Sequence, residues 1–120
     1  MSSRDSRIPG FYKLPLSERR ETLFERTGTD PADAAVLDGG GIDVATADRL
    51  VENAVGVYGL PLGLGLNFCV NGRDVIVPMA VEEPSVIAAA SNAAKMIRAG
   101  GGFVADADPP VMTAQVELLD

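Results

Sequence analysis

Two apolar segments joined by Asn71-Gly72 constrain the fold of this chain more than any other feature. Residues 63–70 (GLGLNFCV) and 73–81 (RDVIVPMAV) are rich in apolar and β-branched side chains, which favour strands. Asn-Gly suits the tight two-residue turn of a hairpin, because both central residues of that turn need a positive φ. The sequence therefore predicts an antiparallel β-hairpin in the middle of the chain.

A helix is predicted near the N-terminus, over Leu16–Arg26. Ser17 is a good N-cap residue, and Leu23 and Phe24 continue the apolar spacing that begins at Leu16. Gly28 is a plausible stop, because glycine is common just after the last helical turn. We expect this helix to end there.

Two further helices are predicted before the hairpin. Asp30 can cap the first one, and Pro31 fits the first helical position. That helix must end by the glycine run at 39–41. The second is predicted over Asp43–Val57, with these apolar residues on one side: Ala45, Leu50, Val51, Ala54 and Val55.

An alanine-rich helix is predicted after the hairpin. Pro84 suits its first turn, Lys95 and Arg98 suit its last turn, and Gly100 suits its C-terminal stop. Its alanines imply close contact with another helix or a sheet. We expect the following residues to form its apolar face: Val86, Ala89, Ala90, Ala93, Met96 and Ile97.

The alternating residues Val111–Leu118 (VMTAQVEL) read as a final strand. No strand follows that could pair with it, so the chain is expected to look cut off. Together these elements predict an α+β fold that is incomplete.

Composition excludes several classes of function. The net charge is -7, from 10 Lys and Arg against 17 Asp and Glu, whereas phosphate backbones need a basic face. With a single cysteine, Cys69, and no histidine, the chain has no internal disulfide and no zinc site built on Cys or His. It also has no His general base. We therefore expect no nucleic-acid partner, no metal and, within the chain, only carboxylates as acid–base groups.

No membrane segment is expected. The stretch from Asn53 to Gly72 is uncharged and about as long as a bilayer span, but Pro61 and several glycines would break a helix there. The N-terminus has no apolar run typical of a secretory signal. The sequence alone therefore predicts a soluble, cytoplasmic protein.

Glu82 and Glu83 precede the alanine-rich helix and form the pair with the clearest chemical potential. Repulsion between adjacent carboxylates helps one of them to hold a proton, as a general acid must. Acidic residues are also common in first helical turns without any catalytic role. Ser85 could bind a ligand at the exposed amides of the helix start, or simply cap the helix.

The remaining motifs are weak. Gly63-Leu64-Gly65-Leu66-Asn67 resembles half of a dinucleotide-binding loop, but it lacks the third glycine and the strand–loop–helix context. Cys69 lies in a predicted strand and is expected to be a small buried side chain. No carboxylate spacing indicates a metal site.

Several segments together resemble class II hydroxymethylglutaryl-CoA reductases. The resemblance runs over nearly the whole chain and is strongest from Leu50 to Phe103, in particular over 71–91. It is carried by Asp5-Ser6-Arg7 with Pro9 and Phe11, Glu52-Asn53-Ala54-Val55-Gly56, Leu60-Pro61, Asn67-Phe68, Asn71-Gly72-Arg73-Asp74-Val75, Val77-Pro78, the run Val81-Glu82-Glu83-Pro84-Ser85 with 86–91, and Gly101-Gly102-Phe103.

The resemblance implies a reaction and a set of roles. The family interconverts hydroxymethylglutaryl-CoA with mevalonate and CoA, using NAD or NADP as hydride carrier. Glu83 would be the catalytic acid that protonates the mevaldehyde-level carbonyl, and Ser85 would bind the carboxylate end of the acyl group. The family's CoA-phosphate arginine matches Tyr12 here, which leaves Lys13 as a weak candidate for that contact.

The resemblance also implies assembly and missing parts. Glu52, Asn53 and Gly56 match a segment at the family's dimer interface, so a homodimer is expected. Residues 1–110 would be the N-terminal part of the large, substrate-binding domain, and 111–120 would begin the connection to a small cofactor domain. The family's catalytic Lys, Asp and His match nothing here, so the chain alone is expected to be inactive and to bind no cofactor. The alternative is a non-catalytic dimerisation module that pairs with itself or with a full-length reductase.

Overall fold

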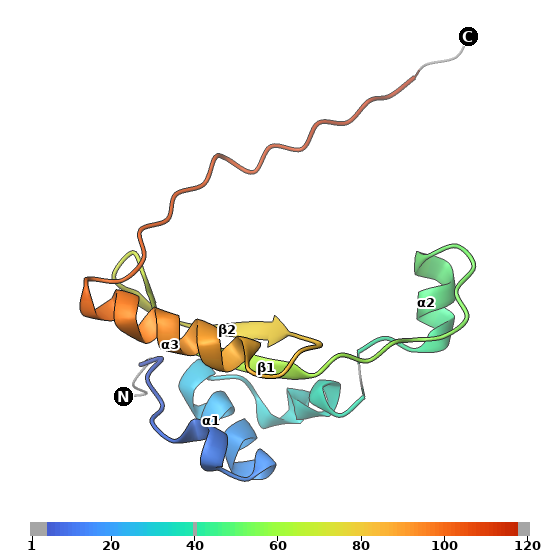
Figure 1. Cartoon of the computed structure of the whole chain (residues 1–120). Coiled ribbons are helices and arrows are strands. Elements are labelled where there is room, and N and C mark those ends of the chain that lie inside the picture. Colours follow the sequence, from blue (N-terminus) through green and yellow to red (C-terminus); the bar gives the residue numbers. More distant parts are fainter. Residues whose placement is uncertain (1–4, 40, 118–120) are drawn as a thin grey trace.

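The computed structural model describes residues 5–39 and 41–117. It combines helices with a two-stranded antiparallel sheet, which confirms the α+β class (Figure 1). The elements are the 3₁₀-helix η1 (Phe11–Lys13), helix α1 (Leu16–Thr27), the 3₁₀-helix η2 (Pro31–Leu37), helix α2 (Val44–Leu50), strands β1 (Leu62–Val70) and β2 (Arg73–Ala80), and helix α3 (Val86–Ala99).

The predicted hairpin is confirmed. Strands β1 and β2 pair in antiparallel register from Val70 opposite Arg73 to Leu62 opposite Ala80. The turn residues Asn71 and Gly72 have φ values of 49° and 74°, the left-handed pair that this turn requires. Local turn chemistry therefore sets the register of the sheet.

A bulge interrupts β1 between Gly65 and Phe68, and helix α3 uses the backbone that it frees. The Leu66 amide donates to the Ser91 hydroxyl at 3.0 Å, and Asn67 Nδ2 donates to the Ser91 carbonyl at 3.0 Å. A bulge leaves ladder groups unpaired. Here the Ser91 hydroxyl of α3 accepts from the freed Leu66 amide, and the Ser6 carbonyl accepts from the Asn67 amide at 3.0 Å. The bonds with Ser91 fix α3 across one face of the hairpin (Figure 1).

The face of α3 that packs on the sheet agrees with the predicted one only at Ala90 and Ala93, which are partly buried. Ala94 is fully buried, and the residues at helical spacing around it that are partly buried are Ile87, Ala90, Ser91 and Arg98. Val86, Ala89, Met96 and Ile97 are exposed. Helix α3 is apolar over most of its circumference, so its sequence does not determine which stripe meets the sheet.

The N-terminal helices follow the sequence with one change. Helix α1 begins after Pro15 rather than at the predicted N-cap Ser17, and ends where the Gly28 amide donates to the Phe24 carbonyl at 2.8 Å. Asp30 caps η2 as predicted, because its Oδ1 accepts from the Ala32 amide at 2.9 Å.

The helix predicted over Asp43–Val57 is much shorter. Asp43 caps α2 through the Thr46 amide at 2.7 Å, but the helix ends at Leu50 and Val51 is already extended, with φ −136° and ψ 143°. Asn53 then takes a φ of 58°. Three β-branched valines and two glycines between 51 and 59 lower helix propensity, and nothing in the described chain packs on them.

The final strand predicted over Val111–Leu118 is wrong over 111–117, which have no regular secondary structure, and Leu118 lies outside the described residues. The tail leaves the hairpin end of the body and extends away from it (Figure 1). Val104 and Met112 are 96% and 92% exposed. A strand needs a paired neighbour, and this segment has none in the described structure.

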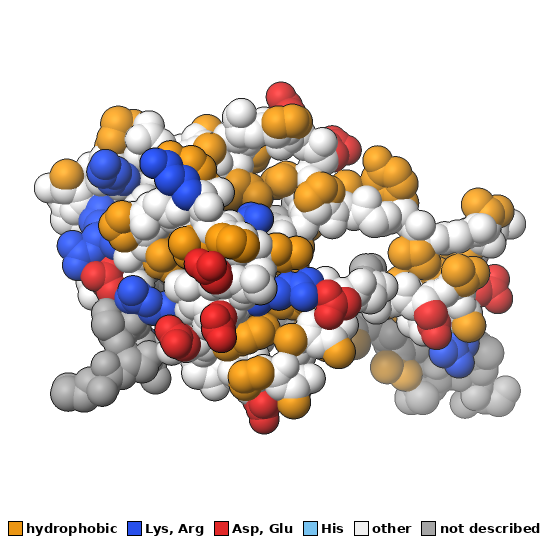
Figure 2. Space-filling view, turned by 90° about the horizontal axis from the view of Figure 1, so that it is seen from below, with side chains coloured by type: hydrophobic (Ala, Val, Ile, Leu, Met, Phe, Trp, Pro, Cys, Tyr) orange, Lys and Arg blue, Asp and Glu red, His pale blue; other side chains and the backbone are white. Residues whose placement is uncertain are grey.

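Little apolar surface is buried. Ala47 and Ala94 are the only buried hydrophobic residues in the part of the chain described here. The accessible surface is 9863 Å², against about 6,200 Å² expected for a folded monomer of this mass. The radius of gyration is 18.8 Å, against about 14 Å for a compact domain. Apolar side chains accordingly spread over the visible face (Figure 2).

Candidate functional site

Glu82 and Glu83 lie in the turn that connects the hairpin to α3. Strand β2 ends at Ala80, and the Val81 amide donates to the Pro61 carbonyl at 3.1 Å. This bond holds the open end of the hairpin together. Glu82 and Glu83 then form the turn into α3, and both are exposed.

An open pocket of 270 Å³ forms at this turn. Its lining residues are Pro61, Val81, Glu82, Glu83, Pro84, Ser85 and Ile87. The structure thus brings together the two predicted site residues Glu83 and Ser85, which both line this pocket. The lining of the pocket is mostly apolar, as in many small-molecule sites, and Glu82, Glu83 and Ser85 are the residues of its lining that carry polar side chains.

Ser85 occupies a backbone conformation that a residue with a side chain rarely adopts. Its φ is 71° and its ψ is −12°, and its carbonyl accepts the Ala89 amide at 2.8 Å as α3 begins. Its hydroxyl makes no capping hydrogen bond, so the capping alternative is wrong. A non-glycine residue in the left-handed region is strained by about 1–3 kcal/mol and such residues cluster at functional sites. The hydroxyl is therefore available to a ligand.

Sequence reasoning did not identify the apolar walls of this pocket. Ile87 reaches over β1 at Gly63, where a Cβ atom would overlap the Ile87 Cδ1 atom. A glycine at 63 thus lets α3 start close to the strand. Pro61, Val81 and Ile87 all lie in segments that carry the family resemblance, but the resemblance gave none of them a role.

The other predicted site residues lie outside the pocket lining. Lys13 is exposed at the end of η1, with its Nζ 5.7 Å from the centroid of the Tyr12 ring. Glu52 and Asn53 form a turn after α2, Gly56 lies in the irregular segment that leads to β1, and all three are exposed. The structure does not join them to Glu83 and Ser85.

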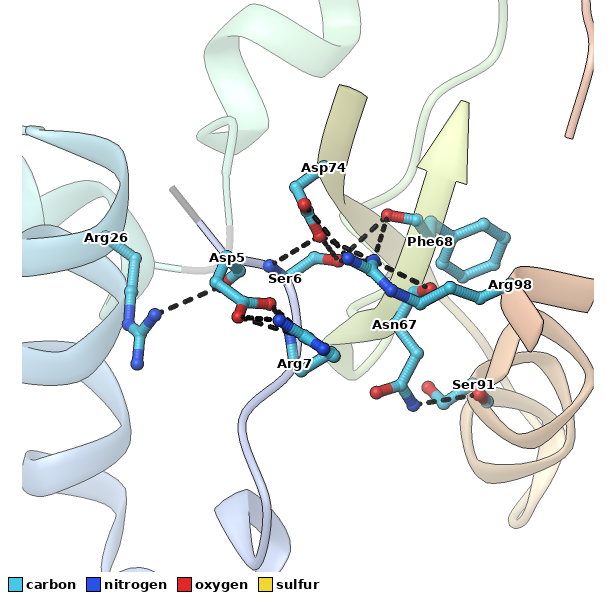
Figure 3. A network of polar contacts seen from close by, with 9 residues as sticks. All are labelled: Asp5, Ser6, Arg7, Arg26, Asn67, Phe68, Asp74, Ser91 and Arg98. Carbon is cyan, nitrogen blue, oxygen red and sulfur yellow. Dashed lines mark hydrogen bonds and ion pairs between the residues drawn. The ribbon is translucent and has the colours of Figure 1, made fainter. Parts of the chain in front are cut away.

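A polar network that was not predicted from the sequence connects the N-terminal segment to the sheet and to α3 (Figure 3). Ser6 is fully buried, and its amide and hydroxyl donate to Asp74 Oδ1 at 3.0 and 2.7 Å. Arg98 donates to both carboxylate oxygens of Asp74. Arg98, followed by Ser6, holds the pKa of the Asp74 carboxyl well below its usual range.

A second ion pair lies beside this network. Arg7 donates to both oxygens of Asp5, with Nη2 and Oδ2 2.6 Å apart, and lowers the pKa of Asp5 to about 2. Arg26 of α1 donates to the Asp5 carbonyl at 3.2 Å. The N-terminal segment is therefore held from both sides, by α1 and by the hairpin (Figure 3).

Two ligand classes find no built site in the described residues. No group of three or more Cys, Asp or Glu side chains is placed to hold a metal ion in 5–39 and 41–117. Gly63 and Gly65 lie inside β1 rather than in a strand–loop–helix turn, so these residues do not fit a dinucleotide. Within the same residues, no helix combines the length and apolar character needed to cross a bilayer.

Comparisons with known proteins agree on one family. The family model described as hydroxymethylglutaryl-coenzyme A reductase matches residues 15–120. The 3-hydroxy-3-methylglutaryl-coenzyme A reductase of Archaeoglobus fulgidus is 45% identical over 113 residues, which are 94% of this chain and 26% of that protein. A reductase of Aspergillus fumigatus is 42% identical over 53 residues, 44% of this chain and 5% of its own length.

Solved structures of the Streptococcus pneumoniae reductase share the fold. One superposes with a TM-score of 0.71 and 42% identity, covering 80% of this chain and 23% of that one. Another, the class II enzyme bound to NADPH in open conformations, gives the same TM-score and identity, and the match covers 26% of that chain. The chain thus spans about a quarter of the length of the archaeal and streptococcal proteins. By this sequence match and this shared fold, the chain belongs to the hydroxymethylglutaryl-coenzyme A reductase family.

Proposed function

We propose that this chain forms the acyl-binding side of a hydroxymethylglutaryl-CoA reductase site. Glu83 supplies the proton, and Ser85 donates a hydrogen bond to the carboxylate end of the hydroxymethylglutaryl group. The observation that carries the proposal is the open pocket in which Glu83 and the uncapped Ser85 lie together against apolar walls.

The geometry suits an acid step at a carbonyl. NAD(P)H, when bound in the complete enzyme, supplies the hydride. Glu83 then donates its proton to the carbonyl oxygen at the mevaldehyde level, where negative charge develops as the hydride arrives. Pro61, Val81 and Ile87 form apolar walls against which the acyl group packs, and the bound acyl group displaces water from beside the exposed Glu83. Glu82 belongs to the same turn and serves as the matched comparison for Glu83.

The remaining parts of the reaction are assigned outside this chain. With no histidine in the sequence and no dinucleotide loop in β1, we assign the nicotinamide site and the family's Lys, Asp and His to polypeptide other than residues 1–120. Residues 1–110 then belong to the substrate-binding domain, and 111–120 lead toward the cofactor domain. Lys13 is proposed as a CoA-phosphate contact. On this proposal the chain alone has no reductase activity.

A chimera tests the proposal. Residues 15–117 replace the matching segment of the Streptococcus pneumoniae reductase, and hydroxymethylglutaryl-CoA-dependent oxidation of NADPH is followed by absorbance. The chimera should be active, and the 120-residue chain should not. An inactive chimera that folds and still binds NADPH would contradict the proposed role, as would activity of the chain alone.

A second candidate function is a dimerisation module, favoured by the segment between α2 and β1. Val55 is fully exposed and Tyr58 is 84% exposed, on extended backbone that nothing in the described residues covers. Apolar side chains displayed together in this way indicate an interface. Glu52, Asn53 and Gly56 lie in the same segment and would contribute to the contact.

Analytical ultracentrifugation distinguishes this second function. The chain should sediment as a dimer, and Val55→Lys should shift it to the monomer, whereas Val104→Lys in the equally exposed tail should not. A parent chain that is monomeric at about 100 µM would contradict self-pairing, because stable homodimers form at much lower concentration. A chain that also fails to co-sediment with a full-length reductase would contradict the module altogether.

A further inference from the structure

The tip of the hairpin makes a clamp on the segment that follows α3. Asn71 Nδ2 donates to the Ala105 carbonyl at 2.8 Å, and the Ala105 amide donates to Asn71 Oδ1 at 3.0 Å. A side-chain amide that gives and receives a hydrogen bond with one residue reproduces the pairing of two strands. One side chain thus holds both polar backbone groups of Ala105.

Backbone bonds and a ring contact hold the residues just before Ala105. The Asn71 amide donates to the Phe103 carbonyl at 2.9 Å, and the Phe103 amide donates to the Cys69 carbonyl at 2.7 Å. The rings of Phe68 and Phe103 stack with centroids 5.6 Å apart. Phe103 therefore forms a one-residue parallel bridge on the edge of β1.

These interactions stop abruptly after Ala105. Residues 106–117 are all exposed and have no regular secondary structure, and the one hydrogen bond from them, Ala107 amide to Asp106 Oδ1, is local. Ala105 is the last residue of the described chain that is attached to the body. The bonds from Asn71 therefore decide where, and in which direction, the chain leaves it.

We propose that Asn71 is a positioning residue, which fixes the exit of the chain at Ala105 so that everything after it pivots about Asp106. Strand β2 begins at Arg73, next to the turn that contains Asn71. It ends at Ala80, and the chain continues through Val81 to Glu83. One hairpin thus connects the pivot to the acid. The consequence for catalysis, that the cofactor-binding part is aimed at Glu83 through this hairpin, rests on the function proposed above.

The test measures orientation directly in the 120-residue chain. Spin labels are placed at Lys95→Cys on α3 and Ala107→Cys beyond the clamp, in a Cys69→Ser background, and their distance distribution is recorded. Asn71→Gly removes both side-chain bonds and keeps the positive φ of the turn. It should broaden the distribution and speed exchange of the Ala105 amide about tenfold.

Conservative and matched variants separate positioning from mere stability. Asn71→Asp keeps the acceptor for the Ala105 amide and should restore most of the amide protection. Arg73→Gln, on the exposed side of the same turn, should change neither readout. An unchanged distribution in Asn71→Gly with protected β1 and β2 amides would overturn the proposal.

If Asn71→Gly loosens the hairpin itself, Ala105→Pro combined with Asn71→Asp decides, because the proline removes the Ala105 donor and the aspartate removes the Nδ2 donor while a side chain stays at the turn. A broader distance distribution, with the β1 and β2 amides still protected from exchange, supports the clamp. An unchanged distance distribution overturns it. Neither result depends on reductase activity. A failed chimera therefore tests the proposed function, while a failed distance measurement tests the clamp alone.

Discussion

Asp74 and Arg98 form a two-pronged ion pair that joins β2 to the last turn of α3. Arg98 Nη1 lies 2.5 Å from Asp74 Oδ1, and Nη2 lies 3.0 Å from Oδ2. The buried Ser6 donates to the same Oδ1 atom through its amide and its hydroxyl. A carboxylate that accepts several charge-assisted bonds is held firmly in place, so three separate parts of the chain meet at Asp74.

Replacing Asp74 should therefore destabilise the chain more than replacing an exposed aspartate. Asp74→Asn removes the charge opposite Arg98 and should lower the free energy of unfolding by about 2 kcal/mol. Asp48→Asn on the exposed surface of α2 is the matched control and should change it by less than about 0.5 kcal/mol. Urea unfolding followed by circular dichroism measures both, and equal midpoints for the two variants would contradict the role of the network.

The same network predicts acid sensitivity. In the folded chain Arg98 holds the pKa of Asp74 below its usual range, and Arg7 lowers the pKa of Asp5 to about 2. A carboxyl whose pKa is lower when folded contributes stability that is present above its unfolded value of about 3.9. This contribution is lost as pH falls through that value toward the folded pKa.

Urea midpoints should therefore fall between about pH 5 and about pH 2, and Asp74→Asn should flatten this dependence. If the urea midpoints of the parent chain and of Asp74→Asn fall with pH in parallel, Asp74 is not the source of the acid sensitivity.

Gly102 approaches β1 too closely to accept a side chain. Its φ is 94°, and a Cβ atom there would lie 2.6 Å from the Cys69 carbonyl oxygen. Gly102→Ala should cost about 2 kcal/mol or more and release Phe103 from its bridge. Gly39→Ala is the control, because its nearest contact would lie at 4.0 Å with no positive φ. Thermal unfolding compares the two, and similar losses in both would refute the close approach.

The tail should be cut by a protease before the hairpin is. Residues 104–117 are exposed and extended, and Val111 and Val116 are 83% and 81% exposed. Proteases cleave such segments before packed ones. Brief digestion with thermolysin, followed by intact mass spectrometry, should give a product that ends near residue 105. Earlier cleavage inside 62–80 would contradict the described hairpin.

Local chemistry allowed part of the fold to be predicted from the sequence. The hairpin follows from Asn71-Gly72, the start of η2 from Asp30 and Pro31, and the end of α1 from Gly28, because each depends on neighbouring residues only. The helix predicted over Asp43–Val57 failed for the complementary reason. Its cap at Asp43 is correct, but continuation past Leu50 needed a packing partner that the described chain does not provide.

Long-range contacts could not be predicted in the same way. Ser6 and Asp74 are 68 residues apart, and no spacing rule connects them. The strand predicted over Val111–Leu118 would likewise need a neighbouring strand that is distant in the sequence. At the site, the resemblance marked Glu83 and Ser85, whereas the pocket wall formed by Ile87 became apparent only once α3 was placed against Gly63.

The most direct measurement of the central claim compares Glu83→Gln with Glu82→Gln in the chimeric reductase. Both variants remove one carboxylate from the same exposed turn, so their effects on folding should match. If Glu83 is the proton donor, Glu83→Gln should lower kcat for NADPH oxidation by about 10²–10⁴-fold, with Glu82→Gln within a few-fold of the parent. Equal losses in the two variants, or a Glu83→Gln chimera with parental kcat, would contradict the assignment of Glu83 as the acid.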